Sequence, residues 1–178
     1  MSRPFLDVGD NLELRRLDPP DAEVLQVIIE ADRDRLRPWM FWAESSTVDS
    51  TRAFIEKAVT DERLDPLGIV VDGELVGVVG ADADAITGNY SLGYWIGSSY
   101  EGRGYVTRAC SALIDHLFSV AGCHRVSLAV SVENPRSRAI AERLGLQQEG
   151  LLREAHLNDL GYQDVALYGI LAQERRAS

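Results

Sequence analysis

The chain is poor in cysteine and histidine: it has two cysteines, Cys110 and Cys123, and three histidines in 178 residues. The cysteines lack the C-x-x-C spacing of redox and zinc motifs, and the histidines complete no ligand set with them. The sequence therefore predicts neither a metal site nor a disulfide framework. Cys110 lies among the apolar positions of a predicted helix, which favours a core residue over a nucleophile.

Long hydrophobic runs are also missing. No stretch approaches the roughly 18 consecutive apolar residues that a membrane-spanning helix needs. The first residues lack the uninterrupted apolar segment of a secretory signal. We therefore expect a cytoplasmic protein with no membrane partner. A length of 178 residues without repeats or low-complexity tracts predicts one domain over residues 1–178.

Positive charge is scarce, because 18 Lys and Arg residues stand against 28 Asp and Glu residues, a formal net charge of −10. Proteins that bind nucleic acids neutralise phosphates with clustered basic side chains, so we expect no nucleic-acid partner. An acidic surface would attract a cationic substrate such as an amine, although the same charge can simply keep a protein in solution. Charge alone leaves both interpretations open.

The N-terminal part of the chain predicts a strand over residues 11–17 and two helices. Asp18 and the two prolines after it indicate the start of the first helix, and the second helix is predicted over about residues 49–62. The loop between the helices is rich in aromatic residues. The positions expected to face the core are Val24, Val27, Ile28 and Ala31 in the first helix and Phe54, Ile55, Ala58 and Val59 in the second.

The rest of the chain predicts an antiparallel meander followed by alternating helices and strands. Asp72-Gly73 is a strong signal for a two-residue hairpin turn. The expected strands are Leu67–Val71, 74–80, Tyr90–Ile96, Arg125–Ser131, 146–155 and 162–172, and the last two flank a turn at 158–161. One expected helix follows the glycine-containing stretch Gly97–Gly104 and runs through about Val120, and another covers 135–144. This order predicts an α/β (α+β) fold with a single mixed sheet flanked by helices.

Two short segments carry candidate chemistry. The first, Glu101-Gly102-Arg103-Gly104-Tyr105-Val106-Thr107, connects a predicted strand to a helix. A glycine-bearing turn at a helix N-terminus exposes N–H groups that can hold a phosphate or pyrophosphate, but a short G-x-G alone is a weak signal. The second, Asn134-Pro135-Arg136-Ser137, opens another helix, and alone it favours plain capping.

Together these segments resemble the GCN5-related N-acetyltransferase (GNAT) superfamily, and within it the branch that acetylates the N-terminal residues of ribosomal proteins. The resemblance covers nearly the whole chain, and the order and spacing of its segments are more specific than any one of them. The other segments that resemble the family are Leu36-Arg37-Pro38-Trp39 with Trp42, Leu92-Gly93-Tyr94-Trp95-Ile96, Glu149-Gly150-Leu151-Leu152-Arg153-Glu154, and Gly161-Tyr162-Gln163-Asp164 with Tyr168. It implies a mostly antiparallel sheet in the GNAT arrangement.

The resemblance also implies acetyl-CoA as the acyl donor, with no metal. Gly104 matches the family's loop pattern Q/R-x-x-G-x-G/A, whereas Glu101 and Val106 depart from it. The pantetheine arm would lie beside the strand that ends with Tyr94-Trp95-Ile96, in a V-shaped gap against the strand Arg125–Ser131. The residues implied in coenzyme binding are Trp95, Ile96, Arg103, Gly104, Tyr105, Val106, Thr107, Asn134 and Ser137.

The implied chemistry is direct transfer in a ternary complex, without a covalent enzyme intermediate. Ser137 would protonate the departing thiolate, since Ala141 holds the position of the tyrosine used in other branches. His156 occupies the position of a glutamate base in similar proteins, and an imidazole is a reasonable base at neutral pH. The alternative is that His156 only lines the site or hydrogen-bonds Tyr168 or a backbone carbonyl. Glu154, expected on the same strand face, is the reserve base.

The acceptor is expected to be an amine. Trp39, Phe41 and Trp42 would roof its site, and Tyr94 and Tyr168 would contribute to it. A free α-amine, with a pKa of about 8, is neutral at pH 7 more often than a lysine amine with a pKa of about 10.4. We therefore expect a protein N-terminus or an amino-acid-like acceptor. A small-molecule amine, such as a polyamine or antibiotic, and a non-catalytic acyl-CoA-binding module remain as alternatives, and a homodimer is compatible with the sequence.

Overall fold

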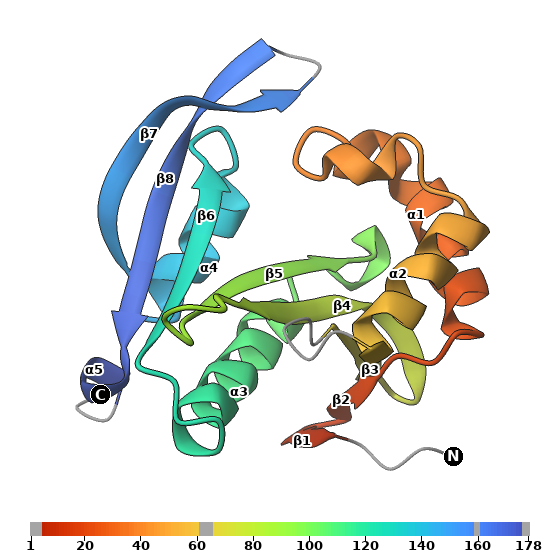
Figure 1. The fold of residues 1–178 in the computed structure, drawn as a ribbon. Coiled ribbons are helices and arrows are strands. Elements are labelled where there is room, and N and C mark those ends of the chain that lie inside the picture. Colours follow the sequence, from red (N-terminus) through yellow and green to blue (C-terminus); the bar gives the residue numbers. More distant parts are fainter. Residues whose placement is uncertain (1–4, 61–65, 159–160, 176–178) are drawn as a thin grey trace.

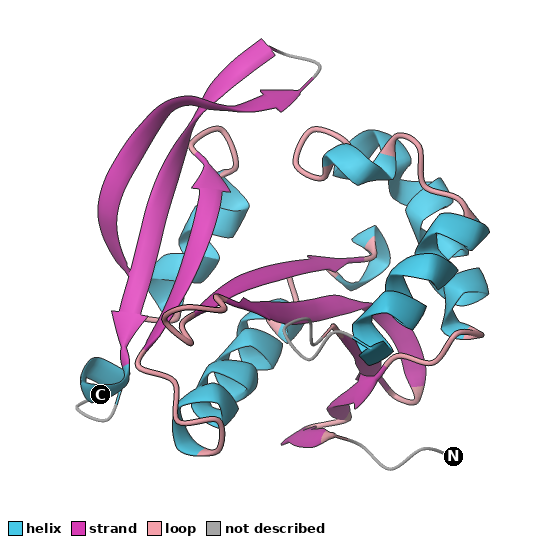
Figure 2. Ribbon diagram, in the orientation of Figure 1, coloured by secondary structure: helices cyan, strands magenta, loops and turns pink. Residues whose placement is uncertain are grey.

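Eight strands pair into one sheet in the computed structural model, which describes residues 5–60, 66–158 and 161–175 (Figures 1 and 2). The strands are β1 (Leu6–Gly9), β2 (Leu12–Arg16), β3 (Leu67–Val71), β4 (Glu74–Ala83), β5 (Tyr90–Ile96), β6 (Arg125–Ser131), β7 (Gln147–Asn158) and β8 (Gly161–Leu171). Their order across the sheet is β1-β2-β3-β4-β5-β6-β8-β7. Every neighbouring pair is antiparallel except β5 and β6, which confirms the prediction of a mixed, mostly antiparallel sheet.

Helices cover both faces of this sheet. They are α1 (Asp21–Leu36), α2 (Val48–Thr60), α3 (Tyr105–Ser119), α4 (Pro135–Arg143) and α5 (Ala172–Arg175), with short 3₁₀ turns η1 (Phe41–Ala43) and η2 (Ser98–Tyr100). One core cluster joins α3 and α4 to the sheet, and smaller clusters join α1 and α2 to the opposite face. None of the described helices is long and apolar enough to span a bilayer.

Several local predictions are confirmed. β3, β5 and β6 have the predicted bounds, and Asp72 and Gly73 form the predicted turn with φ of 52° and 84°. Cys110 is fully buried in the core, as expected. The predicted end of the second helix beyond residue 60, and the centre of the predicted turn at 158–161, lie outside the described residues.

The predicted inner face of the first helix is wrong. Val24 is 47% exposed and Val27 is 68% exposed, whereas Leu25 and Ile29 are buried. Both sets repeat with helical spacing, and the larger side chains of the second set fill the core. Phe54 in α2 is likewise 45% exposed, while its neighbour Ile55 is buried.

The sheet opens between β5 and β6. These parallel strands pair only at Tyr90↔Val126 and Ser91↔Ser127, although β5 stays paired with β4 as far as Ile96. Figure 1 shows β6 turning upward while β5 continues across the molecule. Beyond Ser91 the β6-facing edge of β5 is therefore left without a strand partner along the described strands.

Candidate functional site

The exposed strand edge of β5 lies in the gap between β5 and β6. Gly97 N–H donates to the Val76 carbonyl of β4 at 2.8 Å, and partners alternate along an antiparallel ladder. By this alternation the backbone N–H and C=O groups of Trp95 pair with β4, whereas the backbone N–H and C=O groups of Tyr94 and Ile96 point towards the gap. Arg35 Nη2 already donates to the Ile96 carbonyl at 2.6 Å. The Tyr94 backbone therefore presents an edge that an extended ligand can join.

The chain enters α3 next to this gap through two glycines with left-handed backbone. Gly102 has φ +72°, and Gly104, the N-cap of α3, has φ +77°. A Cβ added at Gly104 would meet nothing within 4 Å, so the space before the helix is open. Gly104 provides no side-chain cap for the first N–H groups of this 15-residue helix. Such a helix end attracts an anion.

The acidic residue in this loop has two cationic partners. The Glu101 carboxylate pairs with Arg35 of α1 at 2.6 Å and with Arg136 of α4 at 2.5 Å. Arg103 lies over the ring of Tyr100, 5.8 Å from its centroid. Glu101 thus links α1 and α4 to the loop. Of the two guanidinium groups beside its carboxylate, that of Arg35 also pairs with Asp32 at 2.7 Å.

Two hydroxyl groups meet across the gap. Ser137 Oγ of α4 lies 2.7 Å from the Tyr94 hydroxyl of β5. Burial raises the pKa of the Tyr94 hydroxyl well above its usual value, against the opposing effect of the Ser137 hydrogen bond, so the phenol stays protonated at physiological pH. Asn134 Oδ1 accepts from Ser137 N–H at 3.1 Å, which is the predicted helix cap. The Tyr94–Ser137 pair was not predicted, since it depends on how β5 and α4 come together.

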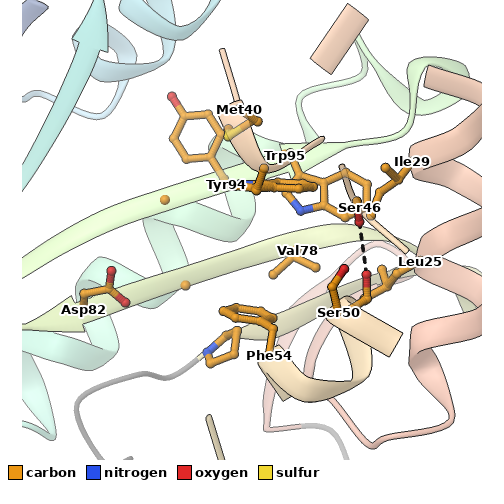
Figure 3. A pocket seen from close by; sticks show the side chains of 15 residues that line it. Leu25, Ile29, Met40, Ser46, Ser50, Phe54, Val78, Asp82, Tyr94 and Trp95 are labelled. Atoms are coloured by element: carbon orange, nitrogen blue, oxygen red, sulfur yellow. Dashed lines mark hydrogen bonds between the residues drawn. The ribbon is translucent and has the colours of Figure 1, made fainter. Parts of the chain in front are cut away.

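A cavity of about 400 Å³ lies between β4, β5 and the helices α1 and α2 (Figure 3). Its lining is mostly apolar, and Figure 3 shows Asp82 at one end of it, away from Trp95 and Ile29. The rings of Trp42 and Trp95 lie 6.0 Å apart by their centroids. The lining residues are Leu25, Ile29, Met40, Trp42, Ser46, Ser50, Thr51, Phe54, Pro66, Val78, Gly80, Asp82, Gly93, Tyr94 and Trp95.

The β7–β8 hairpin reaches the loop after α1. His156 Nε2 lies 3.1 Å from the Pro38 carbonyl oxygen, and Asn158 Nδ2 donates to the same oxygen at 2.8 Å. His156 thus makes a hydrogen bond to a backbone carbonyl, and its role as the base stays a prediction. Because a carbonyl can only accept, Nε2 carries the proton in this bond, and Nδ1 of a neutral ring keeps its basic lone pair.

Glu154 does not share a regular strand face with His156, so that expectation is wrong. β7 has an irregularity between Leu152 and His156, and Glu154 within it has φ +52°. A bulge of this kind breaks the two-residue alternation on which the expectation was based. Glu154 is exposed, and its N–H donates to Asp164 Oδ1 at 2.9 Å.

Comparison with known proteins gives the family. Residues 11–147 match the acetyltransferase (GNAT) domain model. The chain belongs to the GNAT acetyltransferase family. It is 32% identical over 173 residues to YdaF of Bacillus subtilis (strain 168), which carries the name ribosomal N-acetyltransferase, with 94% of each chain covered. It is 26% identical over 168 residues to the ribosomal-protein-serine acetyltransferase of Escherichia coli (strain K12), with 92% of this chain and 94% of the relative covered.

A solved GNAT structure agrees with this assignment. The microcin C7 self immunity acetyltransferase MccE, in complex with acetyl-CoA and AMP, has a TM-score of 0.89 and 26% identity, covering 96% of this chain and 97% of its own. The protein is thus an acetyl-CoA-dependent N-acetyltransferase, and its acceptor is an amine. The described residues contain no group of three or more His, Cys, Asp or Glu side chains that could hold a metal ion.

The gap fits acetyl-CoA, which supplies the acetyl thioester. The uncapped end of α3 and the open space at Gly104 suit the diphosphate, through the backbone of Arg103, Tyr105, Val106 and Thr107. The β5 edge suits the amides of the pantetheine arm. Of the two β5 residues expected to bind the coenzyme, Ile96 faces the gap, whereas Trp95 lines the cavity on the other face.

The residues expected at the acceptor are only partly brought together. Trp42 and Tyr94 line the cavity, but Phe41 is 80% exposed. Trp39 is half-buried and lies outside the described lining of the cavity. Tyr168 is buried in the core, where its hydroxyl accepts from Arg138 Nε at 3.1 Å, so we do not retain it as an acceptor contact.

We expect Ser137→Ala to lower kcat by about 10- to 100-fold, the range given by loss of one hydrogen bond to a developing charge. The coenzyme Kd should change much less, because the predicted role of this hydroxyl is to protonate the departing sulfur. Steady-state kinetics and calorimetry measure the two effects. Tyr94→Phe, which keeps the ring, should give a smaller loss of kcat. An unchanged kcat in Ser137→Ala would remove this serine from the reaction.

Proposed function

We propose that this GNAT enzyme acetylates an α-amine, that of a protein N-terminus or an amino-acid-like molecule. The observation that carries this proposal is the position of His156, hydrogen-bonded to Pro38 in the loop that leads to Met40 and Trp42 of the cavity. An α-amine is neutral at pH 7 more often than a lysine amine, so it needs less assistance from a base at this position. The relatives that are named ribosomal acetyltransferases support a protein as the acceptor.

The transfer we propose is a direct attack of the amine on the thioester. Both cysteines are buried, and burial raises the pKa of the Cys110 thiol far above neutrality, so neither suits a covalent intermediate. His156 would take the proton of the amine, directly or through a water. Ser137, hydrogen-bonded to Tyr94, would donate to the departing sulfur.

The test is an acceptor panel followed by mass spectrometry. It compares short peptides with free and blocked N-termini, each containing an internal lysine, with spermidine and an aminoglycoside. We expect acetyl-CoA to be consumed only with free N-termini and the product mass to locate the acetyl group on the first residue. Acetylation of spermidine or the drug alone would instead establish the small-molecule alternative. Coenzyme binding without transfer to any amine would establish the non-catalytic one.

A cytoplasmic location and a homodimer stay predictions. Light scattering of the purified protein measures the second through the molar mass in solution. A mass near 19.6 kDa, that of one chain, would contradict it.

A further inference from the structure

We propose that the cavity between α1, α2 and the β4–β5 floor receives the first side chain of the acceptor and selects a bulky apolar one, as in leucine, methionine or phenylalanine. This inference rests on the proposed α-amine acceptor. It goes further by assigning the residue class that the enzyme acetylates.

The walls of the cavity are apolar. Leu25 and Ile29 of α1 are buried at 2% exposure each, and Met40, Trp42 and Trp95 complete that side. A volume of about 400 Å³ exceeds what one large side chain needs and leaves room for its backbone. Burial of apolar surface therefore favours an acceptor with a large hydrocarbon or aromatic side chain.

The hydroxyl groups in the lining already have partners within the protein. Ser46 Oγ donates to Gln26 Oε1 at 3.0 Å, and Thr51 Oγ1 donates to the same atom at 3.3 Å. Ser50 Oγ donates to the Thr47 carbonyl at 3.0 Å. These hydroxyl protons are therefore already used within the protein, and an apolar side chain on the acceptor leaves their hydrogen bonds intact.

The floor has no side chains at its centre. Gly80 of β4 and Gly93 of β5 lie directly opposite each other in the ladder. A Cβ added at Gly93 would meet nothing within 4 Å, and Gly93 is absent from the described residues with positive φ. Neither packing nor backbone conformation requires glycine there. The open space above Gly93 is part of the cavity, and the pair of glycines preserves it.

The cavity adjoins the reaction centre. Gly93 immediately precedes Tyr94, whose backbone faces the gap and whose hydroxyl meets Ser137. A first residue whose side chain enters the cavity can therefore keep its α-amine at the β5 edge. The mostly apolar lining disfavours an acidic first residue, because burial of a charged side chain without a partner is costly.

The experiment measures kcat/KM for peptides that differ only in the first residue: Leu, Met, Phe, Ala, Ser and Asp. We expect the large apolar residues to exceed Ser by about 10- to 100-fold, the usual range for an apolar pocket, with Asp last. Gly93→Val, which suits a strand, should remove most of this preference by filling the cavity. The readout is the ratio of kcat/KM for the Leu peptide to kcat/KM for the Ala peptide, because this ratio cancels any loss of activity that both peptides share.

Gly150→Ala is the matched control, because its added Cβ would make ordinary contact with Leu167 at 3.9 Å, outside the cavity. If Gly93→Val does not fold, Phe54→Ala, on the half-exposed wall, should lower the preference for Leu instead. A parent enzyme that prefers Ser or Ala, or a Gly93→Val variant that keeps the preference for Leu, would overturn the inference. Failure to acetylate any peptide at its first residue would instead overturn the proposed function.

Discussion

Gly104→Asp is expected to lower the affinity for coenzyme A by at least about 100-fold while leaving the protein folded. Asp tolerates left-handed backbone better than most residues and is a favourable helix N-cap, so the φ of +77° and the position before α3 accommodate it. Its carboxylate would, however, lie in the open space where the diphosphate is proposed to bind. Two like charges roughly 4 Å apart repel by about 4 kcal/mol at an effective dielectric constant of 20.

Calorimetry measures the Kd, and thermal melts with and without millimolar coenzyme A measure the loss of ligand stabilisation. Gly104→Asn has the same shape without the charge and should retain more affinity. Gly102→Asp, with φ +72° and equally open space two residues earlier, places the charge outside the helix end and should cost less. If a folded Gly104→Asp protein binds coenzyme A with unchanged affinity, the loop before α3 does not bind the diphosphate and only connects β5 to the helix.

His156→Gln should lower kcat/KM by roughly 10²- to 10⁴-fold, the usual contribution of a positioned base. The amide of Gln can still donate to the Pro38 carbonyl, as Nε2 does in the parent at 3.1 Å, so the loop keeps this contact while the basic Nδ1 is lost. A general base acts only in its unprotonated form, so kcat/KM of the parent should fall on the acid side. The Gln variant should lose this limb. His156→Glu should retain activity and move the limb to lower pH, since carboxylic acids ionise at lower pH than imidazole.

Two controls separate the base from a structural role. Asn158→Ala removes the neighbouring hydrogen bond to Pro38 and should leave the acid limb in place. The acceptor amine titrates as well, so the profiles are compared for acceptors of different pKa. If His156→Gln keeps full activity with the same acid limb, the proton leaves by another route, and Glu154 or a water becomes the better candidate.

Strand and helix order could be predicted because local pattern decides it. The alternation in Arg125–Ser131 and the turn at Asp72-Gly73 depend on neighbouring residues alone. β1 was not predicted, because four residues give little periodicity. The signal that could have located its end is the sequence Gly9-Asp10-Asn11, since these residue types favour turns, and all three have positive φ in the structure. The face of α1 needed packing information, since two sets of apolar residues share the helical period.

The residues of the candidate site likewise divide into those that local sequence predicts and those that depend on how distant segments pack together. Gly104 and Asn134 could be assigned from local signals, because a left-handed turn and a helix cap are properties of the segment itself. The contact between Tyr94 and Ser137 joins residues 43 positions apart and follows from the sheet order. The bulge at Glu154 arises in the pairing of β7 with β8, and no feature of β7 alone reveals it.

The divergence of β5 from β6 also bears on how the molecule holds together. The two halves of the sheet, β1–β5 and β6–β8, share a ladder of only two residue pairs. A pantetheine arm lying along the Tyr94 edge would add hydrogen bonds at the one seam where the sheet makes few of its own. While bound, acetyl-CoA would therefore be both the reactant and an additional strand of the sheet. The sheet would lose this strand each time the coenzyme product leaves.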